Sequence, residues 1–469
     1  MGSSLAPLRN SYNGRRCFIV ATGPSLAYKN LSFLKDEVTI ALNLASLTLD
    51  IFNIKPTFNI IADKYQYTRY KEVYEKLTYN TLVKKIIVAS ACDTFPAELI
   101  DSETYFVPHK LPQEKPSFSE NPIDEGFSRG KTVAFDAIQL AYYLGFSEIY
   151  ILGMDLGLKY DWGVDGHCYE IHRNERFLDV SFAKSNDYEI QRGLPGHPEY
   201  FEFISECMEL AKQFFDSSAI KVYNDISSKL EVFTKIDVLR KFGASLKVVA
   251  FVPAKGTSSR VKDKNKKLLG NKPLFLHVLD TLLKSMSIDE VYLDTESDEI
   301  LSLAGERNYK PLKREASLAT NDTDGNKLLL NEAVHVDADI YVQVLPTAPF
   351  LSRETVDNAV FKLIMSKEND SLFGVIKSKF YLWDEGGNSS YDIYHIPNSV
   401  DLKDTIIETM SLYVIRKEAL FKGKSRIGEK PIFYNIPYME SFDTNTYEDF
   451  ELANILLKGK EALKNESNA

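Results

Sequence analysis

The segment Val248–Leu274 limits, more than any other part of the sequence, how this chain can fold. It opens with the apolar run Val248–Val252, whose length and composition are typical of a strand buried on both faces of a parallel sheet. A loop with Gly256 and several serine, threonine, lysine and arginine residues follows, and a helical pattern begins at Leu274. Glycine lets backbone amides approach a ligand closely, and amides, hydroxyls and cations together can hold phosphate groups. This order predicts a nucleoside triphosphate site; the alternative is a solvated basic loop between two ordinary elements.

Length and composition indicate what kind of protein carries this loop. At 469 residues the chain is too long for one compact core, and its 44% hydrophobic and 26% charged residues are typical of a soluble globular protein. The net charge of −10 argues against nucleic-acid binding over the whole surface. The four cysteines are scattered, with no CxxC pair, which indicates reduced thiols and no zinc site. Because no apolar segment suits a signal peptide or a bilayer span, we expect a cytoplasmic protein, with contact at the inner face of the cytoplasmic membrane left open.

The first half repeats the arrangement of a short strand followed by a small-residue turn. Arg16–Val20 is apolar enough for a buried strand, and Gly23, Pro24 and Ser25 follow it. A turn at the carboxyl end of the first strand is where open α/β sheets bind ligands, although a plain tight turn has the same sequence. Later strand candidates end near polar residues that we expect to converge on the same sheet edge, namely Asn43, Asp63 and Asp155.

Strands and helices alternate along both halves of the chain. This alternation predicts an α/β fold with two domains, each an open, mostly parallel sheet with helices on both faces. The stretch Phe233–Ser245 carries no strong strand signal, and Val248 restarts the alternation. We therefore place the two domains at residues 1–243 and 244–469.

Several motifs of the second half match one enzyme family. They are Lys255–Ser258, Arg260, Lys264–Asn265, Arg314–Ala319, Pro346–Pro349, Glu408–Tyr413 and Asp443. Through these motifs, residues 248–460 resemble the cytidylyltransferases that activate acidic ketoses, in particular the CMP-sialic acid (N-acylneuraminate) synthetases. The resemblance implies a nucleotidyltransferase domain in which the anomeric hydroxyl of a keto-sugar acid attacks the α-phosphate of CTP and pyrophosphate leaves. Either a sialic-acid-like sugar or 3-deoxy-octulosonic acid would fit this class of substrate.

The resemblance also implies roles for individual residues. Arg260 and Lys264 would be catalytic, because cations neutralise the phosphate charge that builds up during the reaction. Asp443 would hold Mg²⁺ with help from the carbonyl of Asn445, since octahedral Mg²⁺ keeps several waters and needs few protein oxygens. The family has a second carboxylate where this chain has Asn445, and often a glutamine where it has Leu345. The implied CTP-binding residues are Lys255, Gly256, Ser258, Asn265 and Arg314.

The first half resembles a second family. The turn at Gly23, the residue Asn43, the segment Arg129–Asp155 and the pair Gly196-His197 are similar to bacterial sialyltransferases of glycosyltransferase family 42 and related motility-associated-factor proteins. The resemblance implies a GT-A-like Rossmann domain in which His197 acts as the general base, a role that suits the near-neutral pKa of histidine. The implied CMP-sugar-binding residues are Gly23, Pro24, Ser25, Asn43, Asp63, Arg129, Thr132, Asp155 and Tyr160.

The two resemblances together predict a bifunctional enzyme. One half would make a CMP-activated acidic sugar from CTP, and the other would transfer that sugar to a bacterial glycan acceptor such as lipooligosaccharide, capsule or flagellin. Related synthetases pair through a segment matching residues 376–410, so we expect a homo-oligomer. Two alternatives stay open: a first half that is a pyrophosphokinase-like or substrate-binding module, and a chain that acts as a scaffold without activity.

Overall fold

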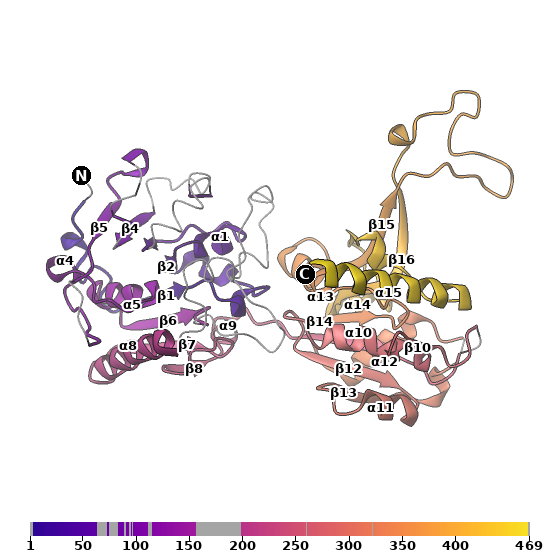
Figure 1. Ribbon diagram of the computed structural model, residues 1–469, viewed down its shortest axis with the longest axis horizontal. Coiled ribbons are helices and arrows are strands. Elements are labelled where there is room, and N and C mark those ends of the chain that lie inside the picture. Colours follow the sequence, from indigo (N-terminus) through magenta and orange to yellow (C-terminus); the bar gives the residue numbers. More distant parts are fainter. Residues whose placement is uncertain are drawn as a thin grey trace. The chain divides into compact units, whose positions relative to one another are not determined.

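The computed structural model shows two compact units, formed by Met1–Ser245 and Leu246–Ala469. It describes residues 3–62, 73–74, 83–88, 91–92, 95, 97–110, 115–155, 198–258, 260–320 and 322–467. Each unit contains one large sheet with helices packed against it (Figure 1). The predicted α/β class with mostly parallel sheets is confirmed. Within the described part of the chain, no helix is both long enough and apolar enough to cross a membrane.

The sheet of the N-terminal unit has eight strands in the order β5-β4-β3-β2-β1-β6-β7-β8, and all neighbouring strands run parallel. Its strands are β1 (Arg16–Val20), β2 (Thr39–Leu42), β3 (Phe58–Ile61), β4 (Lys84–Val88), β5 (Thr104–Val107), β6 (Glu148–Leu152), β7 (Lys221–Asp225) and β8 (Thr234–Ile236). The chain lays β2 to β5 on one side of β1 and β6 to β8 on the other. The point where the strand order reverses is where open α/β sheets bind ligands, so the turns after β1 and β6 are the candidate edge.

The helices of this unit cover the buried strands. Those in the described residues are α1 (Ala45–Asp50), α4 (Pro122–Glu125), α5 (Val133–Tyr143), α8 (Pro198–Asp216) and α9 (Val238–Lys241). Helix α5 is buried along most of its length and shares one core with β1, β2 and β6. Two sequence predictions are corrected here. Residues 109–130 are rich in proline, serine, glutamate and glycine, which predicts a long surface loop, but they include the single-turn helix α4. The stretch before the boundary contains β8 and α9, which are too short to give a clear sequence signal.

The sheet of the C-terminal unit has seven strands in the order β13-β12-β9-β14-β16-β15-β17. Its strands are β9 (Val248–Pro253), β12 (Glu290–Thr295), β13 (Lys310–Lys313), β14 (Ile340–Val344), β15 (Ser371–Ser378), β16 (Thr405–Arg416) and β17 (Pro431–Asn435). The predicted buried strand at Val248 is confirmed as β9, all of whose residues are buried. Of these seven described strands, only β16 runs antiparallel to both of its neighbours. The strand order reverses at β9, which lies between β12 and β14.

Helices cover both faces of this second sheet. They are α10 (Leu274–Leu282), α11 (Asp298–Ala304), α12 (Gly325–His335), α13 (Arg353–Met365), α14 (Lys417–Gly423) and α15 (Tyr447–Ser467), and β10 (Leu268–Leu269) and β11 (Lys272–Pro273) form a separate small hairpin. Alternate residues of β9 point to opposite faces. Val248, Ala250 and Val252 share a core with α10 and α13, while Val249 and Phe251 pack with α12.

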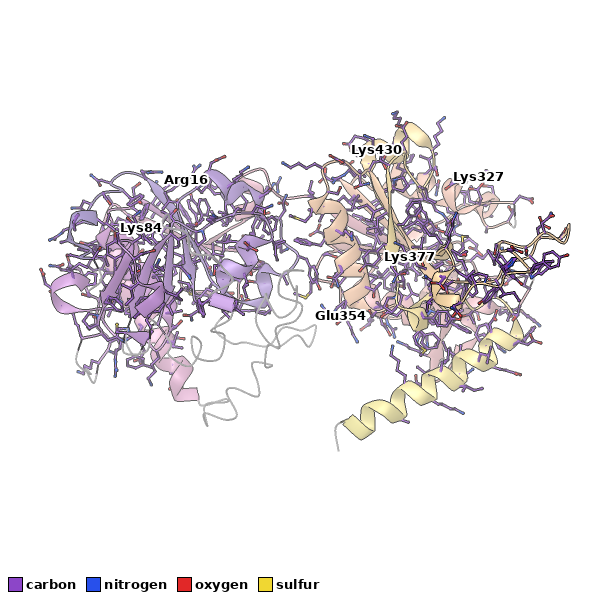
Figure 2. The ribbon with its side chains drawn as sticks, turned by 90° about the horizontal axis from the view of Figure 1, so that it is seen from above. Arg16, Lys84, Lys327, Glu354, Lys377 and Lys430 are labelled. Carbon is purple, nitrogen blue, oxygen red and sulfur yellow. The ribbon has the colours of Figure 1, made fainter. Side chains whose placement is uncertain are left out.

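The connection between β15 and β16 extends away from the sheet, as Figure 1 shows. In Figure 2 the side chains of this connection lie outside the sheet, beyond Lys377 near the end of β15. Several large apolar side chains in and beside this connection are exposed, among them Trp383 at 55% and Tyr394 at 86%. The connection lies within residues 376–410, the segment on which the sequence-based expectation of a homo-oligomer rests, and the homo-oligomer remains a prediction.

Candidate active site

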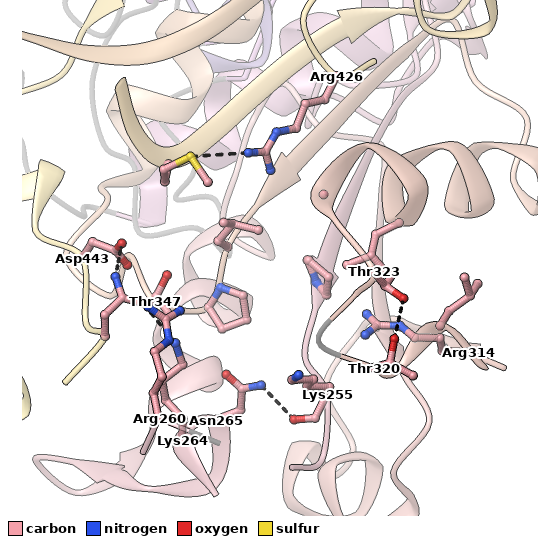
Figure 3. Close-up of a pocket in the computed structure, with 18 residues that line it drawn as sticks. Lys255, Arg260, Lys264, Asn265, Arg314, Thr320, Thr323, Thr347, Arg426 and Asp443 are labelled. Atoms are coloured by element: carbon pink, nitrogen blue, oxygen red, sulfur yellow. Dashed lines mark hydrogen bonds between the residues drawn. The ribbon is translucent and has the colours of Figure 1, made fainter. Parts of the chain in front are cut away.

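A cavity of about 530 Å³ lies at the carboxyl edge of the C-terminal sheet. Its walls come from the segments after β9 and β14, where the strand order reverses, and from β16 and the segments after α14 and β17. Figure 3 shows the side chains that line it. The sequence-predicted residues among them are Lys255, Arg260, Lys264, Asn265, Arg314, Asp443 and Asn445. The fold thus brings together residues from distant parts of the chain that the sequence analysis assigned to one site.

The loop after β9 is held by contacts that fix its backbone. The Gly256 amide donates to Glu296 Oε1 at 2.6 Å, and Asn265 Nδ2 donates to the Lys255 carbonyl at 2.8 Å. A Cβ on Gly256 would lie 2.7 Å from the Cβ of Ser297, so only glycine fits without displacement. Gly256 and Ser258 are not among the described residues that line the cavity. Gly256 therefore shapes the loop through its packing, and Asn265 closes the loop.

Three cations of this loop face the cavity. Burial, together with the nearby charges of Arg260 and Lys255, lowers the pKa of Lys264 to about 8, against the opposing effect of Asp443. Lys264 Nζ donates to Asn445 Oδ1 at 3.4 Å, which is a long contact to a neutral group. Like charges gathered in a partly buried place are unfavourable unless an anion joins them. The cluster is suited to bind phosphate groups.

The predicted metal residue Asp443 lies beside Arg260 and Lys264 (Figure 3), and Asn445 contacts Lys264. Asn445 Nδ2 donates to Asp443 Oδ2, and the Asn445 amide donates to Asp449 Oδ2 at 2.8 Å. Asp443 Oδ1 is buried and has no hydrogen-bond partner within the described structure. An unsatisfied carboxylate oxygen beside an amide carbonyl fits Mg²⁺, which takes oxygen ligands and retains water. No group of three or more His, Cys, Asp or Glu side chains suited to a metal occurs among the described residues.

Arg314, predicted to bind CTP, is tied into a buried charge network. It is 4% exposed, and its Nε and Nη2 bond to the Asp294 carboxylate, with Nη2 at 2.5 Å from Oδ2. Burial raises the pKa of the neighbouring Glu332 well above its usual range, and the charge of Asp294 raises it further. Glu332 Oε2 accepts from Gln343 Nε2 at 3.0 Å. Asp294 thus holds Arg314 in one orientation at the cavity wall, near Thr320 and Thr323 (Figure 3).

The cavity also has residues that sequence reasoning did not single out. Arg426 lies on the segment after α14, which carries no motif that could have identified it. Met410 lines the cavity with a backbone φ of 52°, in the left-handed region that favours glycine. This position lies within Glu408–Tyr413, the counterpart of a family motif in which glycine occupies the third place. The positive φ at Met410 is a backbone feature that the sequence conceals.

In the N-terminal unit the structure brings Gly23, Ser25 and Asp155 together at the turns after β1 and β6. Asp155 Oδ2 accepts from the Ser25 amide at 2.9 Å, and Oδ1 accepts from the Lys229 amide at 3.2 Å. A Cβ on Gly23 would lie 2.2 Å from Asp155 Oδ2. Pro24 begins the 3₁₀ turn Pro24–Leu26, which this carboxylate caps. Asp155 therefore fastens two turns through backbone amides.

The other predicted residues of this unit have local structural contacts. Asn43 has a φ of 48° and its Oδ1 accepts from the Ala62 amide at 3.3 Å. Thr132 caps α5 by accepting from the Ala134 amide, and the Arg129 carbonyl lies 3.8 Å from Cys207 Sγ. Their roles in CMP-sugar binding remain predictions. The predicted residues Asp63, Tyr160 and His197 lie outside the described residues.

A partly buried pair in this unit was not predicted. His109 follows β5, and its Nε2 lies 3.1 Å from Oδ1 of Asp136 in the first turn of α5. Asp136 is 2% exposed, and burial raises its pKa although His109 opposes the shift. The two residues are far apart in sequence, and no motif marks either. The pair ties the segment after β5 to α5.

Comparison with known proteins agrees with the geometry of the C-terminal unit. Residues 249–448 match the family described as "Cytidylyltransferase". The CMP-N,N'-diacetyllegionaminic acid synthase of Legionella pneumophila is 25% identical over 244 residues, which are 46% of this chain and 100% of that protein. The pseudaminic acid cytidylyltransferase of Campylobacter jejuni is 26% identical over 232 residues, 45% of this chain and 97% of that protein. The C-terminal unit resembles CMP-acylneuraminate synthetases.

Other relatives are longer or more distant. The N-acylneuraminate cytidylyltransferase A of Danio rerio is 25% identical over 215 residues, 44% of this chain, and the match spans 50% of that protein's length. Among solved structures, a CMP:2-keto-3-deoxy-manno-octonic acid synthetase complexed with CTP aligns with 46% of this chain and 99% of that one, at 16% identity and a TM-score of 0.36.

The N-terminal unit matches a different family. Residues 1–161 match the family described as "6-hydroxymethylpterin diphosphokinase MptE-like". The comparisons do not support the predicted resemblance of this half to sialyltransferases. An MptE-like domain instead agrees in part with the alternative that the first half is pyrophosphokinase-like.

Proposed function

We propose that the C-terminal unit transfers the cytidylyl group of CTP to a sialic-acid-like acidic ketose. The anomeric oxygen of the sugar forms a bond to the α-phosphorus, the bond from that phosphorus to the pyrophosphate oxygen breaks, and the hydroxyl proton leaves to solvent. The observation that carries the proposal is the convergence of Lys255, Arg260, Lys264 and Asp443 on one cavity. The relatives, which include a CMP-N,N'-diacetyllegionaminic acid synthase and a pseudaminic acid cytidylyltransferase, support this class of substrate.

The side chains have distinct parts in this reaction. Lys255, Arg260 and Lys264 attract the triphosphate and neutralise charge that increases on its oxygens as pyrophosphate departs. Asp443 Oδ1 and the carbonyl of Asn445 would hold Mg²⁺. When bound, the ion would supply further positive charge to the phosphate oxygens. Asp294 holds Arg314 in place at the cavity wall. Because the Arg314 side chain is already ordered, it loses little conformational freedom when a nucleotide binds, which favours affinity.

The test is pyrophosphate release from CTP with Mg²⁺ and a panel of N-acetylneuraminic, legionaminic, pseudaminic and 3-deoxy-octulosonic acids. We expect turnover with at least one sugar, and Lys264→Ala should abolish it. The matched control is Lys262→Ala, which removes one charge from the same loop at an exposed position outside the cavity lining. A Lys264→Ala protein with wild-type turnover, or no turnover by the wild type with any ketose, would contradict the proposal.

For the N-terminal unit, a diphosphokinase-like activity is the second candidate, supported by the family match of residues 1–161. Transfer of the activated sugar to a surface glycan remains the first prediction for this unit and has no support from the comparisons. The two candidate activities release different products. Incubation with ATP and a pterin alcohol should release AMP if the unit is a diphosphokinase, whereas incubation with a CMP-sugar should release CMP if it is a glycosyltransferase.

A further inference from the structure

Arg426 forms part of the cavity wall opposite the phosphate loop, which is the loop after β9 that carries Lys255 and Lys264. In Figure 3 it lies across the cavity from Lys255 and Lys264. Arg426 is 9% exposed, so its charge is largely removed from bulk water. A phosphate chain held by the loop leaves this wall to the second substrate. Arg426 is therefore placed to contact the sugar rather than the triphosphate.

The contacts of the Arg426 guanidinium are weak. Its Nη1 lies 3.5 Å from Gln343 Oε1 and its Nη2 lies 3.5 Å from Met410 Sδ. The nearest carboxylate oxygen, Glu408 Oε1, is 4.0 Å away, and Glu408 is itself bonded to the Tyr413 hydroxyl. Within the described structure no carboxylate is in hydrogen-bonding distance of this guanidinium. A buried cation without such a partner is costly, although stacking on the Tyr413 ring at 3.7 Å offsets part of that cost.

The beginning of α12 makes room for this side chain. A Cβ on Gly325 would lie 2.2 Å from Arg426 Nη1 and 2.8 Å from its Cζ, so glycine is needed where the guanidinium packs. The Arg426 amide donates to Asn326 Oδ1 at 3.0 Å, which fixes the segment to the helix. The N-terminus of a helix carries partial positive charge, so it disfavours a neighbouring cation and favours an anion. Asp324 caps the helix and interacts electrostatically with Arg426, but its side chain is 58% exposed and does not bond to the guanidinium. An anion that bonds to Arg426 at the start of α12 would therefore be favoured.

We propose that Arg426 binds the carboxylate of the acidic ketose. A guanidinium presents paired donors that match the two oxygens of a carboxylate. The substrate class of the proposed function supplies such a group, and the inference rests on that function. A keto-sugar acid bound here keeps its carboxylate across the cavity from the phosphate loop and can turn its anomeric hydroxyl toward the α-phosphate. Arg426 thereby selects acidic ketoses over neutral sugars.

The experiment compares the wild type with Arg426→Gln and Arg426→Lys, using the best ketose from the panel and its methyl ester. For Arg426→Gln we expect the KM for the acid to rise about 10- to 100-fold, with the Kd for CTP within about twofold of the wild type. The wild type should prefer the acid to the ester, and the variant should lose most of that preference. Arg426→Lys should recover part of it, because the charge remains but the paired donors do not.

Lys327→Gln is the matched control, because Lys327 lies in the first turn of α12, against which Arg426 packs, and is labelled in Figure 2. Its side chain is 61% exposed. It removes the same charge and should leave the KM for the acid unchanged. Retained CTP binding shows that each variant is folded. An unchanged KM for the acid in Arg426→Gln, or a loss of CTP affinity instead, would overturn the inference.

Direct binding separates this inference from the proposed function. Saturation-transfer NMR with N-acetylneuraminic acid and its methyl ester reports sugar binding without turnover. Should the wild type bind the acid and release no pyrophosphate, loss of binding in Arg426→Gln would still support the carboxylate subsite while the proposed reaction fails. Equal binding of the acid by wild type and variant would overturn the subsite whatever the activity.

Discussion

The lowered pKa of Lys264 predicts how CTP binding depends on pH. With a pKa of about 8, Lys264 is mostly protonated at pH 7 and mostly neutral at pH 9. The protonated fraction falls from roughly 90% to roughly 10% across this interval. If CTP binds the protonated lysine, its apparent Kd should rise about tenfold from pH 7 to pH 9, because a phosphate anion favours the charged form. The last phosphate pKa is about 6, so the nucleotide is mostly fully ionised from pH 7 upward and its charge changes little over the same range.

The assay is calorimetric titration of CTP into the protein at half-unit steps from pH 7 to pH 9, at constant ionic strength and saturating Mg²⁺. Proton uptake on binding should be greatest above pH 8 and can be read from the dependence of the enthalpy on buffer. Lys264→Arg is the decisive comparison, because arginine stays charged throughout this range. Its CTP affinity should be nearly independent of pH.

Two results would refute the reasoning. A wild-type Kd that stays constant between pH 7 and pH 9 would mean that Lys264 is not the group that CTP requires in charged form. The same slope in Lys264→Arg as in the wild type would assign the titration to another group. Lys262→Ala serves as the control for loss of one charge in the same loop, and its slope should equal that of the wild type.

The remaining predictions concern stability, metal affinity and the first unit. Because the pKa of Lys264 is lower in the folded chain, the unfolded chain binds more protons between about pH 8 and 10.5, and the stability of the ligand-free protein should rise across this window. Lys264→Met should stabilise the protein at pH 7 by on the order of 1 kcal/mol after allowance for solvent screening, and should not stabilise it at pH 10.5. Urea unfolding measures both changes. Asn445→Asp should lower the Mg²⁺ concentration for half-maximal activity by about tenfold, because it adds a carboxylate ligand; a metal titration of pyrophosphate release measures it. Gly23→Ala should destabilise the N-terminal unit by about 2–4 kcal/mol, since its Cβ would lie 2.2 Å from Asp155 Oδ2, and calorimetry should show that change while CTP turnover stays constant.

Much of the fold could be predicted from local sequence because parallel strands buried on both faces are short apolar runs. The run at Val248 and the run at Arg16 both become central strands of their sheets. The elements before the domain boundary were not predicted, since β8 has only three residues and α9 one turn. Such short elements depend on packing against the rest of the unit, which the local pattern does not contain.

The candidate site also contains some residues that the local sequence predicts and others that it does not. Residues that act through charge within one loop, such as Lys264, could be found because the loop follows a strand and the family pattern marks it. Arg426 could not, because its place in the cavity depends on Gly325 and Tyr413, which lie far from it in sequence. Asp155, by contrast, was predicted as a binding residue but makes structural contacts. Its position after a strand predicts a ligand contact, whereas its two oxygens accept from backbone amides of other turns.

The replacement of a second carboxylate by Asn445 is consistent with the charge balance of the cavity. Lys255, Arg260 and Lys264 bring three positive charges, and Asp443 brings one negative charge next to them. A second aspartate at position 445 would strengthen metal binding, but it would also lie against Lys264, whose only described hydrogen-bond acceptor is Asn445 Oδ1. That contact would hold the lysine charge in an ion pair and compete with the phosphate of CTP. Asparagine keeps an oxygen for the metal and leaves the lysine available to the nucleotide. The same substitution that weakens the metal site therefore strengthens the phosphate site, and the opposite should hold in Asn445→Asp, with a lower Mg²⁺ requirement and a higher KM for CTP.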